Sequence, residues 1–252
     1  MKAVGVWPQG YARRVLETVD STNSEAARIA PELLAPTWIL GLEQTAGRGR
    51  RGRPWVDTHG NFAATLVMQP DEPADRVALR SFVAALALFD ALARVIGDAS
   101  SLALKWPNDV LLNEGKLAGI LLESAGLGAR LSHFMIGIGV NLIHAPGAGD
   151  VETSAWRPVS LKGETGIEIG PEDFLAVLAE TYAAREIQFS TYGFSPIRTA
   201  WLEQAARLGE VITAKTARET FTGCFETVDE HGNLVLSIGN TRHAIPAAEV
   251  FF

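Results

Sequence analysis

The chain has 252 residues, of which 47% are hydrophobic and 20% charged, a composition that allows one large domain or a large and a small one. Its net charge of -7 and its pI near 5.3 argue against a general nucleic-acid binder, so any anion-binding site must be local. The single cysteine excludes a disulfide framework and a cysteine zinc cluster, and no signal core or membrane-spanning run is present, so we expect a cytoplasmic protein.

The first half of the chain predicts strands and two helices. Residues 21–34 have the spacing of a helix with one apolar face, and Thr22 followed by Glu25 matches a capping box at its start. Residues 81–97 are apolar almost all round, which indicates a helix buried in the core. The other predicted elements are a short strand in 11–20 and buried strands at 36–45 and 61–70.

The second half changes from strands to helices and back. Residues 102–124 predict three strands, with turns at Pro107 to Asp109 and at Glu114-Gly115. Residues 145–170 are rich in turn formers and carry no clear pattern. The remaining predicted elements are a buried strand at 133–143, helices at 171–190 and 195–208, and short β-rich runs from about 208 onward.

A run of helices followed by a run of short strands suggests two domains. We place the larger one at residues 1–207 and the smaller one at 208–252. The fold class is therefore α+β, with a mixed β-sheet backed by helices. The C-terminal segment suits a small β-barrel that leans on the larger domain for stability.

An arginine-rich loop, "AGRGRRGRPW" at 46–55, is unexpected in an acidic chain. Its glycine spacing matches the G-x-G-x-x-G dinucleotide fingerprint, but Pro54 and Trp55 follow where a helix must begin, so we reject that interpretation. Glycines let the backbone approach a ligand closely, and arginines offer planar forks for carboxylate and phosphate. The arginines alone are equally consistent with a solvated loop, whereas a nucleic-acid patch is disfavoured by the overall charge.

Five motifs, which occur in order along the chain, favour a ligand-binding loop over a solvated one. They are "STN" at 21–23, "EQTAGRGRRGRPW" at 43–55, "KWPNDVLL" at 105–112, "GKLAGILLE" at 115–123 and "GIGVNL" at 137–142. Together they resemble the biotin protein ligases over most of residues 15–145, and more loosely in the C-terminal module, which would then be an SH3-like barrel. The related lipoate ligases and octanoyltransferases share the fold but are not expected to combine "GRGRRGRPW" with "KWPND".

The resemblance implies a two-step reaction with ATP and biotin as substrates and Mg²⁺ as the metal. The biotin carboxylate attacks the α-phosphorus of ATP to give biotinyl-5′-AMP, and a lysine of a biotin carboxyl carrier protein then takes the biotin. Because the STN motif begins at residue 21, we expect no helix-turn-helix domain and no DNA-binding role. A membrane partner is not expected, and both a monomer and a homodimer stay open.

The resemblance also assigns roles to residues. Lys116, Arg48 and Arg50 are the expected catalytic residues, since cations near the carboxylate and α-phosphate lower their repulsion. Lys116 alone would be read as a solvent-facing turn lysine, and only its motif favours catalysis. The residues expected to bind biotin are Ser21, Thr22, Asn23, Gln44, Gly47, Arg48, Gly49, Arg50, Lys116 and Gly119. For Ser21 to Asn23, helix capping is an equally open role.

The nucleotide is expected to be bound by a second group of residues. These are Arg50, Arg51, Trp55, Lys105, Asn108 and Asn141, with Asn108 and Asp109 as candidate Mg²⁺ ligands. An ordinary Asn-Asp turn after Pro107 and a core tryptophan at position 55 are the alternatives. For the whole chain, the rival functions are a lipoate-type ligase or acyltransferase, and a noncatalytic protein that binds biotin or nucleic acid.

Overall fold

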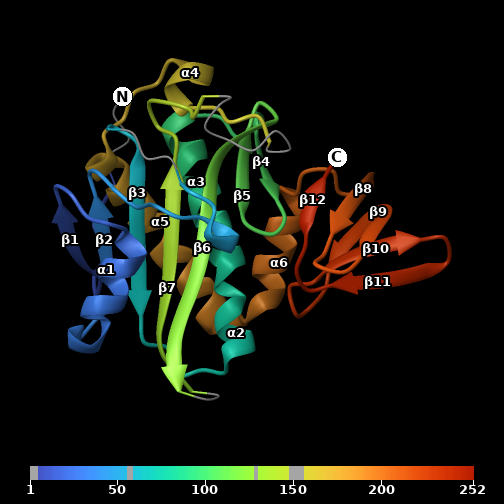
Figure 1. Cartoon of the computed structure of the whole chain (residues 1–252), viewed down its shortest axis with the longest axis horizontal. Coiled ribbons are helices and arrows are strands. Elements are labelled where there is room, and N and C mark those ends of the chain that lie inside the picture. Colours follow the sequence, from blue (N-terminus) through green and yellow to red (C-terminus); the bar gives the residue numbers. More distant parts are fainter. Residues whose placement is uncertain (1–4, 56–58, 128–129, 148–155) are drawn as a thin grey trace.

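The protein is described by a computed structural model that covers residues 5–55, 59–127, 130–147 and 156–252. Figure 1 shows one mixed β-sheet with helices on both faces, and a second, smaller sheet beside it at the C-terminal end. The strands of the large sheet are β1 (Ala12–Leu16), β2 (Thr37–Gly41), β3 (Phe62–Met68), β4 (Leu102–Lys105), β5 (Asp109–Leu112), β6 (Gly115–Leu127) and β7 (Arg130–Val140). The predicted mixed sheet is thus confirmed.

The large sheet has the order β1-β2-β3-β7-β6-β5-β4. Only β1 and β2 pair in parallel, because the helix α1 (Thr22–Ile29) and a short 3₁₀ turn (Ala30–Glu32) return the chain between them. All other neighbours are antiparallel and are joined by turns or longer excursions. In the centre of the sheet, every residue of β3 is buried, and its neighbours are β2 and β7.

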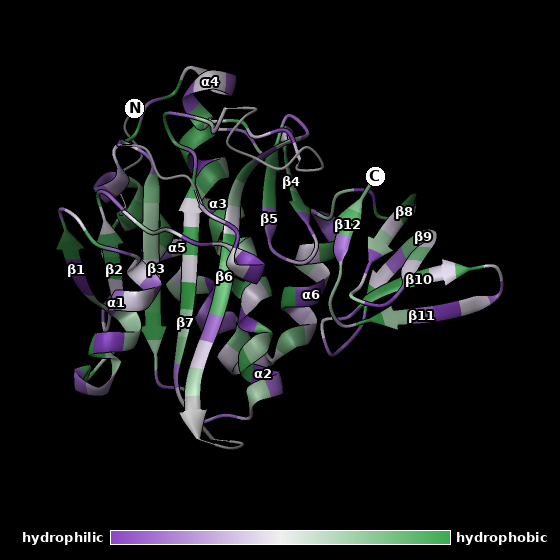
Figure 2. Ribbon diagram, viewed as in Figure 1, coloured by the Kyte–Doolittle hydropathy of each residue, from purple (hydrophilic) through white to green (hydrophobic). Residues whose placement is uncertain are grey.

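The two faces of the sheet are covered by different helices. On one face, α1 packs its apolar side on β2, β3 and β7, through Ala26 and Ala30 against Ile39, Val67 and Met135. On the other face lie α3 (Arg80–Ile96), α5 (Pro171–Tyr192) and α6 (Phe194–Glu203), which also pack on one another. Figure 2 shows the hydrophobic residues following these strands and inner helices.

Helix α3 confirms the expectation of a buried helix. Its side chains from Phe82 to Phe89 are buried without interruption, and Gly97 ends it in a left-handed conformation. Helix α5 begins with Pro171 and two acidic residues in its first turn, as its sequence predicts. The described part of the chain contains no helix long and apolar enough to cross a bilayer.

Three local expectations need correction. The N-cap of α1 is Ser21, without a side-chain cap bond, so the capping box of Thr22 and Glu25 is wrong: the Thr22 amide donates to Gln44 instead. The turn between β5 and β6 is made by Asn113 and Glu114, both with positive φ, rather than by a glycine. Short helices at Ala74–Ala78 (α2) and Leu161–Thr165 (α4) were not expected.

The C-terminal strands form their own antiparallel sheet, in the order β11-β10-β9-β8-β12. They are β8 (Val211–Lys215), β9 (Thr220–Val228), β10 (Leu234–Ile238), β11 (Thr241–Ile245) and β12 (Glu249–Phe251). Trp106 of the large unit donates its indole N–H to the carbonyl of Gly232 at 3.1 Å, and the two units share one apolar core. This packing places β12 beside the β4–β5 turn, and residues of both line the same cleft.

Candidate active site

A cleft of about 280 Å³ opens on the α1 side of the large sheet. Its walls are the start of α1, the arginine-rich loop, the centres of β6 and β7, the β4–β5 turn and strand β12. Of the predicted site residues it brings together Ser21, Thr22, Asn23, Gln44, Arg48, Gly49, Arg50, Arg51, Trp55, Lys105, Asn108, Asp109, Lys116, Gly119 and Asn141. Gly47 is not on its surface.

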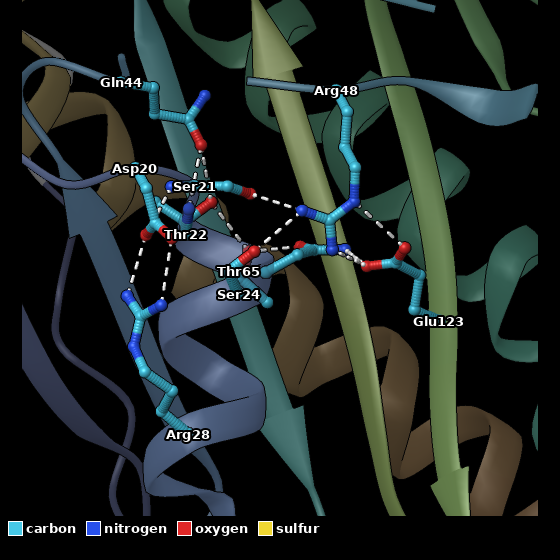
Figure 3. Close-up of polar contacts among 10 residues, drawn as sticks. Asp20, Ser21, Thr22, Ser24, Arg28, Gln44, Arg48, Thr65 and Glu123 are labelled. Carbon is cyan, nitrogen blue, oxygen red and sulfur yellow. Dashed lines mark hydrogen bonds and ion pairs between the residues drawn. The ribbon is translucent and has the colours of Figure 1, made fainter. Parts of the chain in front are cut away.

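The start of α1 is fixed by a network of hydroxyl and amide groups at one end of the cleft. The Thr22 amide and hydroxyl donate to Gln44 Oε1 at 2.8 and 3.1 Å. Below them, the buried hydroxyl of Thr65 on β3 lies 2.8 Å from Thr22 Oγ1 and 2.5 Å from Asn23 Oδ1 (Figure 3). The Ser21 amide donates to Asp20, whose pKa is held low by hydrogen bonds from Arg28 and from that amide. The uncharged side chains of Ser21, Thr22, Asn23, Gln44 and Thr65 thus form a neutral corner with both donors and acceptors.

Arg48 is tied to this corner by a carboxylate. Its Nε and Nη2 donate to Glu123 Oε1 and Oε2 at 3.2 and 2.9 Å, and Asn23 Nδ2 donates to the same Oε2 at 2.7 Å. Its Nη1 donates to Ser24 Oγ at 2.8 Å and to Ser21 Oγ at 3.3 Å (Figure 3). Glu123 therefore neutralises Arg48 and links the loop to the helix start.

The arginine-rich loop folds back on itself across the front of the sheet (Figure 1). Gly49 N donates to the Arg53 carbonyl at 2.8 Å, and Trp55 N donates to the Gly47 carbonyl at 3.0 Å. A methyl group at position 47 would lie 2.9 Å from the Trp55 carbonyl, which explains a glycine there. Gly47 thus lets the two ends of the loop pack closely together. Arg51, with φ 58, makes the turn at the loop tip.

The other three loop arginines reach two different partners. Arg50 enters the cleft and donates to Asn108 Oδ1 at 3.1 Å, while burial lowers its pKa. Arg51 and Arg53 both reach Glu249 on β12. Arg50 is accordingly the loop arginine whose charge lies deepest in the cleft.

Two lysines share one buried carboxylate in the β4–β6 region. Lys116 Nζ lies 2.8 Å from Asp109 Oδ1, and Lys105 Nζ lies 3.8 Å from Oδ2. Burial alone would raise the pKa of Asp109, but the charges of the two lysines outweigh it and lower that pKa. Burial lowers the pKa of Lys105. Only Lys116 of the pair is substantially exposed, with 32% of its side chain accessible.

Glycines on β6 and β7 make room for the cleft's walls. A methyl group at Gly139 would meet the Trp55 ring at 2.4 Å, and one at Gly137 would meet Asn23 Oδ1 at 2.4 Å. At Gly119, a methyl group would lie 3.4 Å from the same ring. Trp55 therefore lies flat against the sheet, with one part facing the cleft.

Asn141 lies buried just after β7. Its Nδ2 donates to the Val159 carbonyl at 3.0 Å, but no described residue bonds to its Oδ1. A buried acceptor without a donor is costly, so this oxygen is suited to a ligand N–H or a water molecule.

The oxygens considered for a metal are engaged by cations. The Asp109 carboxylate faces Lys116 and Lys105, and Asn108 Oδ1 accepts from Arg50. Within the described ranges, no group of three or more histidine, cysteine, aspartate or glutamate side chains is placed to hold a metal ion. These residues do not fit a protein-built metal site.

The arrangement favours the binding of anions. Among the described residues, the cleft is lined by the cations Arg48, Arg50, Arg51, Arg53, Lys105 and Lys116, against the carboxylates Asp109 and Glu249. Cys224 is not part of the lining. Such a site can hold two negative reactants together and stabilise charge that develops between them.

Sequence reasoning missed several residues that shape the site. They are Thr65, Glu123, Gly137, Gly139 and Glu249. Glu123, Gly137 and Gly139 lie inside the five motifs, so the motifs themselves could have identified them as site residues. Thr65 and Glu249 lie in otherwise ordinary strands, and only the fold brings them to the cleft.

Comparisons with known proteins agree with this geometry. Residues 15–141 match the Biotin/lipoate A/B protein ligase family, and residues 208–252 match the Biotin protein ligase C terminal domain. The chain is 56% identical over 238 residues to a biotin–[acetyl-CoA-carboxylase] ligase of Paracoccus denitrificans, covering 94% of this chain and 99% of that one. It is 30% identical to a bifunctional ligase/repressor of Bacillus subtilis, of which it covers 71%.

Solved structures show the same fold. A biotin protein ligase from Aquifex aeolicus in complex with biotin and ATP has a TM-score of 0.80 at 24% identity, over 95% of this chain and 97% of that chain. A biotin protein ligase from Leishmania major in complex with biotinyl-5-AMP has a TM-score of 0.65 at 22% identity, over 95% of this chain and 100% of that chain.

Proposed function

Since this chain belongs to the biotin/lipoate A/B protein ligase family, we propose that it acts as a biotin protein ligase, like the relative from Paracoccus denitrificans. In this role it joins biotin to a lysine of the biotin carboxyl carrier protein of acetyl-CoA carboxylase. One observation carries the proposal: a neutral, hydrogen-bonding corner at Ser21 to Asn23 and Gln44 opens directly into a cationic cleft.

The neutral corner suits the ureido ring of biotin. That ring presents a carbonyl acceptor and two N–H donors, which hydroxyl and amide side chains can match. Ser21, Thr22, Asn23 and Gln44 are the residues that we propose for this contact, and Thr65 holds two of them in place. Arg48 keeps the corner joined to the loop through Glu123, and a contact with biotin itself would require that ion pair to rearrange.

The cationic part of the cleft suits the reacting groups. The biotin carboxylate attacks the α-phosphorus of ATP, and pyrophosphate leaves. Both reactants are anionic, so Lys116 and Arg50 serve to offset their repulsion and to stabilise charge as the bond forms. Gly49 lets the backbone approach them closely, Trp55 packs on the adenine, and Asn141 Oδ1 accepts from it.

The second step needs an amine and the exclusion of water. The amine of the carrier lysine attacks the acyl carbon of biotinyl-5′-AMP, an amide bond forms, and AMP departs. The folded loop over the cleft shelters the mixed anhydride until the carrier arrives. Mg²⁺ is proposed as the companion of the ATP phosphates rather than as a metal held by Asn108 and Asp109.

The assay that tests this function is direct. Incubation with biotin, MgATP and a carrier domain should attach one biotin to one carrier lysine, read by mass spectrometry. Biotin, and not lipoate, should raise the melting temperature in the presence of ATP. Stabilisation by lipoate alone would indicate a lipoate-type enzyme, and biotin binding without pyrophosphate release would indicate a noncatalytic binding protein. The cytoplasmic location and the absence of a DNA-binding role stay predictions.

Replacing Gly139 with alanine should weaken ATP binding. The added methyl group would lie 2.4 Å from the Trp55 ring, so the ring must leave its place against β7. We expect the affinity for ATP, measured by calorimetry, to fall by about tenfold, since a stacking contact contributes on the order of 1–3 kcal/mol. The control is Gly170→Ala, because a methyl group there meets nothing within 4 Å. Unchanged ATP affinity in Gly139→Ala would rule out the proposed role of Trp55.

A further inference from the structure

The tip of the arginine-rich loop is held by a residue of the C-terminal sheet. Arg53 Nη1 and Nη2 donate to Glu249 Oε1 and Oε2 at 2.8 and 3.1 Å, and Arg51 Nη1 donates to Oε2 at 3.1 Å. We propose that Glu249 is a positioning residue that latches this loop over the cleft and thereby retains biotinyl-5′-AMP, an inference that rests on the proposed function. It gives Arg51 and Arg53 a role other than binding the ligand.

The loop needs an external anchor at its tip. Its internal backbone bonds join Gly49 to Arg53 and Gly47 to Trp55, which fixes its neck. The tip, Arg51 and Gly52, is exposed and turns through positive φ values. Glycine-rich backbone of this kind loses much conformational entropy when it is ordered, so a side-chain anchor has a measurable effect on how often it opens.

The anchor is also electrostatically matched to the loop. Four arginines within six positions repel one another, and the Glu249 carboxylate is shared by two of them. The hydrogen bond from Arg53 lowers the pKa of Glu249, so this carboxyl is ionised at neutral pH. The bidentate geometry with Arg53 makes this pair more favourable than an ordinary surface contact.

The position of Glu249 is itself well fixed. It lies on β12, paired in register with Lys215 of β8, and the next residue, Val250, is 3% exposed in the core. Ala248, Val250 and Phe251 line the cleft together with Glu249. Release of the loop from Glu249 would therefore open the cleft along the side that the C-terminal sheet provides.

The experiment that tests this latch replaces Glu249 with glutamine. We expect the rate of the first pyrophosphate release to stay within about twofold of the unmodified protein, whereas the release of biotinyl-5′-AMP into solution rises about three- to fivefold, the upper part of the range for one partly exposed charged contact. Glu230→Gln is the matched control, because Glu230 is an exposed carboxylate of the β9–β10 turn, 82% accessible and paired only weakly with His231. Its release rate should not change.

A second measurement tests the latch without any substrate. Trypsin should cut Glu249→Gln within residues 48–53 about three- to fivefold faster than it cuts the unmodified protein or Glu230→Gln, at equal melting temperatures. Equal cleavage rates would overturn the latch, and so would unchanged release of the adenylate. If the unmodified protein makes no biotinyl-5′-AMP, the proposed function fails, while the cleavage rates still decide whether Glu249 holds the loop.

Discussion

Replacing Lys116 with glutamine is expected to slow biotin-dependent exchange of pyrophosphate into ATP by about 10²–10³-fold, the loss typical of removing one group that stabilises transition-state charge. The Nζ atom of Lys116 is partly exposed to the cleft and lies 2.8 Å from Asp109, which keeps it in one place. Because the lysine acts on charge that develops during attack, the affinity for biotin alone should change little. Calorimetry with biotin and the exchange assay measure the two quantities separately.

The control for this variant is Lys162→Gln. Lys162 is an exposed lysine of α4 that pairs with Glu168 and is not part of the cleft lining, so its removal should leave the exchange rate unchanged. Lys116→Gln also removes one of the two lysines that pair with the buried Asp109. The melting temperature of the variant must therefore be recorded, to separate a loss of stability from a loss of catalysis. An exchange rate within threefold of the unmodified protein would remove Lys116 from the catalytic group.

Replacing Arg80 with leucine should destabilise the protein by about 3–5 kcal/mol, the cost of breaking a buried ion pair by removing one partner. Arg80 has only 5% of its side chain exposed and lies between Glu72 and Glu186, with nitrogen–oxygen distances of 2.5 and 2.7 Å. Without it, Glu186 loses this ion pair and Glu72 keeps only the one with Arg76. Urea denaturation at pH 7, compared with Arg94→Gln at an exposed pair, measures the effect; the control should lose at most about 1 kcal/mol.

The same variant should show a distinctive dependence on pH. Burial raises the pKa of Glu72, but the hydrogen bond and charge of Arg80 outweigh this and hold it below its usual value. A carboxyl whose folded-state pKa is lowered stabilises the fold above its unfolded-state pKa, and this contribution is lost as the pH falls through the lower folded-state value. Arg80→Leu removes that contribution, so its deficit relative to the unmodified protein should shrink in acid. A deficit that is constant with pH would mean that packing, not charge, explains the loss.

Much of the fold was predictable because its core elements have strong local signals. The apolar run that forms α3, the buried strands β2 and β3 and the proline start of α5 were all expected from the sequence and are confirmed. Helix α4 was not, because it has five residues and its only start signal is the side-chain cap of Ser160, in a stretch rich in turn formers. Short helices of this kind depend on tertiary contacts more than on propensity.

Site residues that lie in sequence motifs could be predicted. Site residues that pair with partners far away in the sequence could not. Ser21, Gln44 and Lys116 were named from the sequence, and the structure places them on one cleft. The capping box failed because Gln44, 22 residues away, takes the Thr22 amide. In the same way Glu123 and Glu249 pair with loop arginines at separations of 75 and 196 residues, which no local pattern reveals.

The cleft is assembled from segments that lie almost a whole chain apart, from Ser21 at the start of α1 to Phe251 on β12. During translation, therefore, the large sheet can form while one wall of the cleft is still inside the ribosome. A nascent chain has no anchor for the loop tip until Glu249 has emerged and β12 has joined β8. One wall of the cleft is thus missing until β12 pairs with β8.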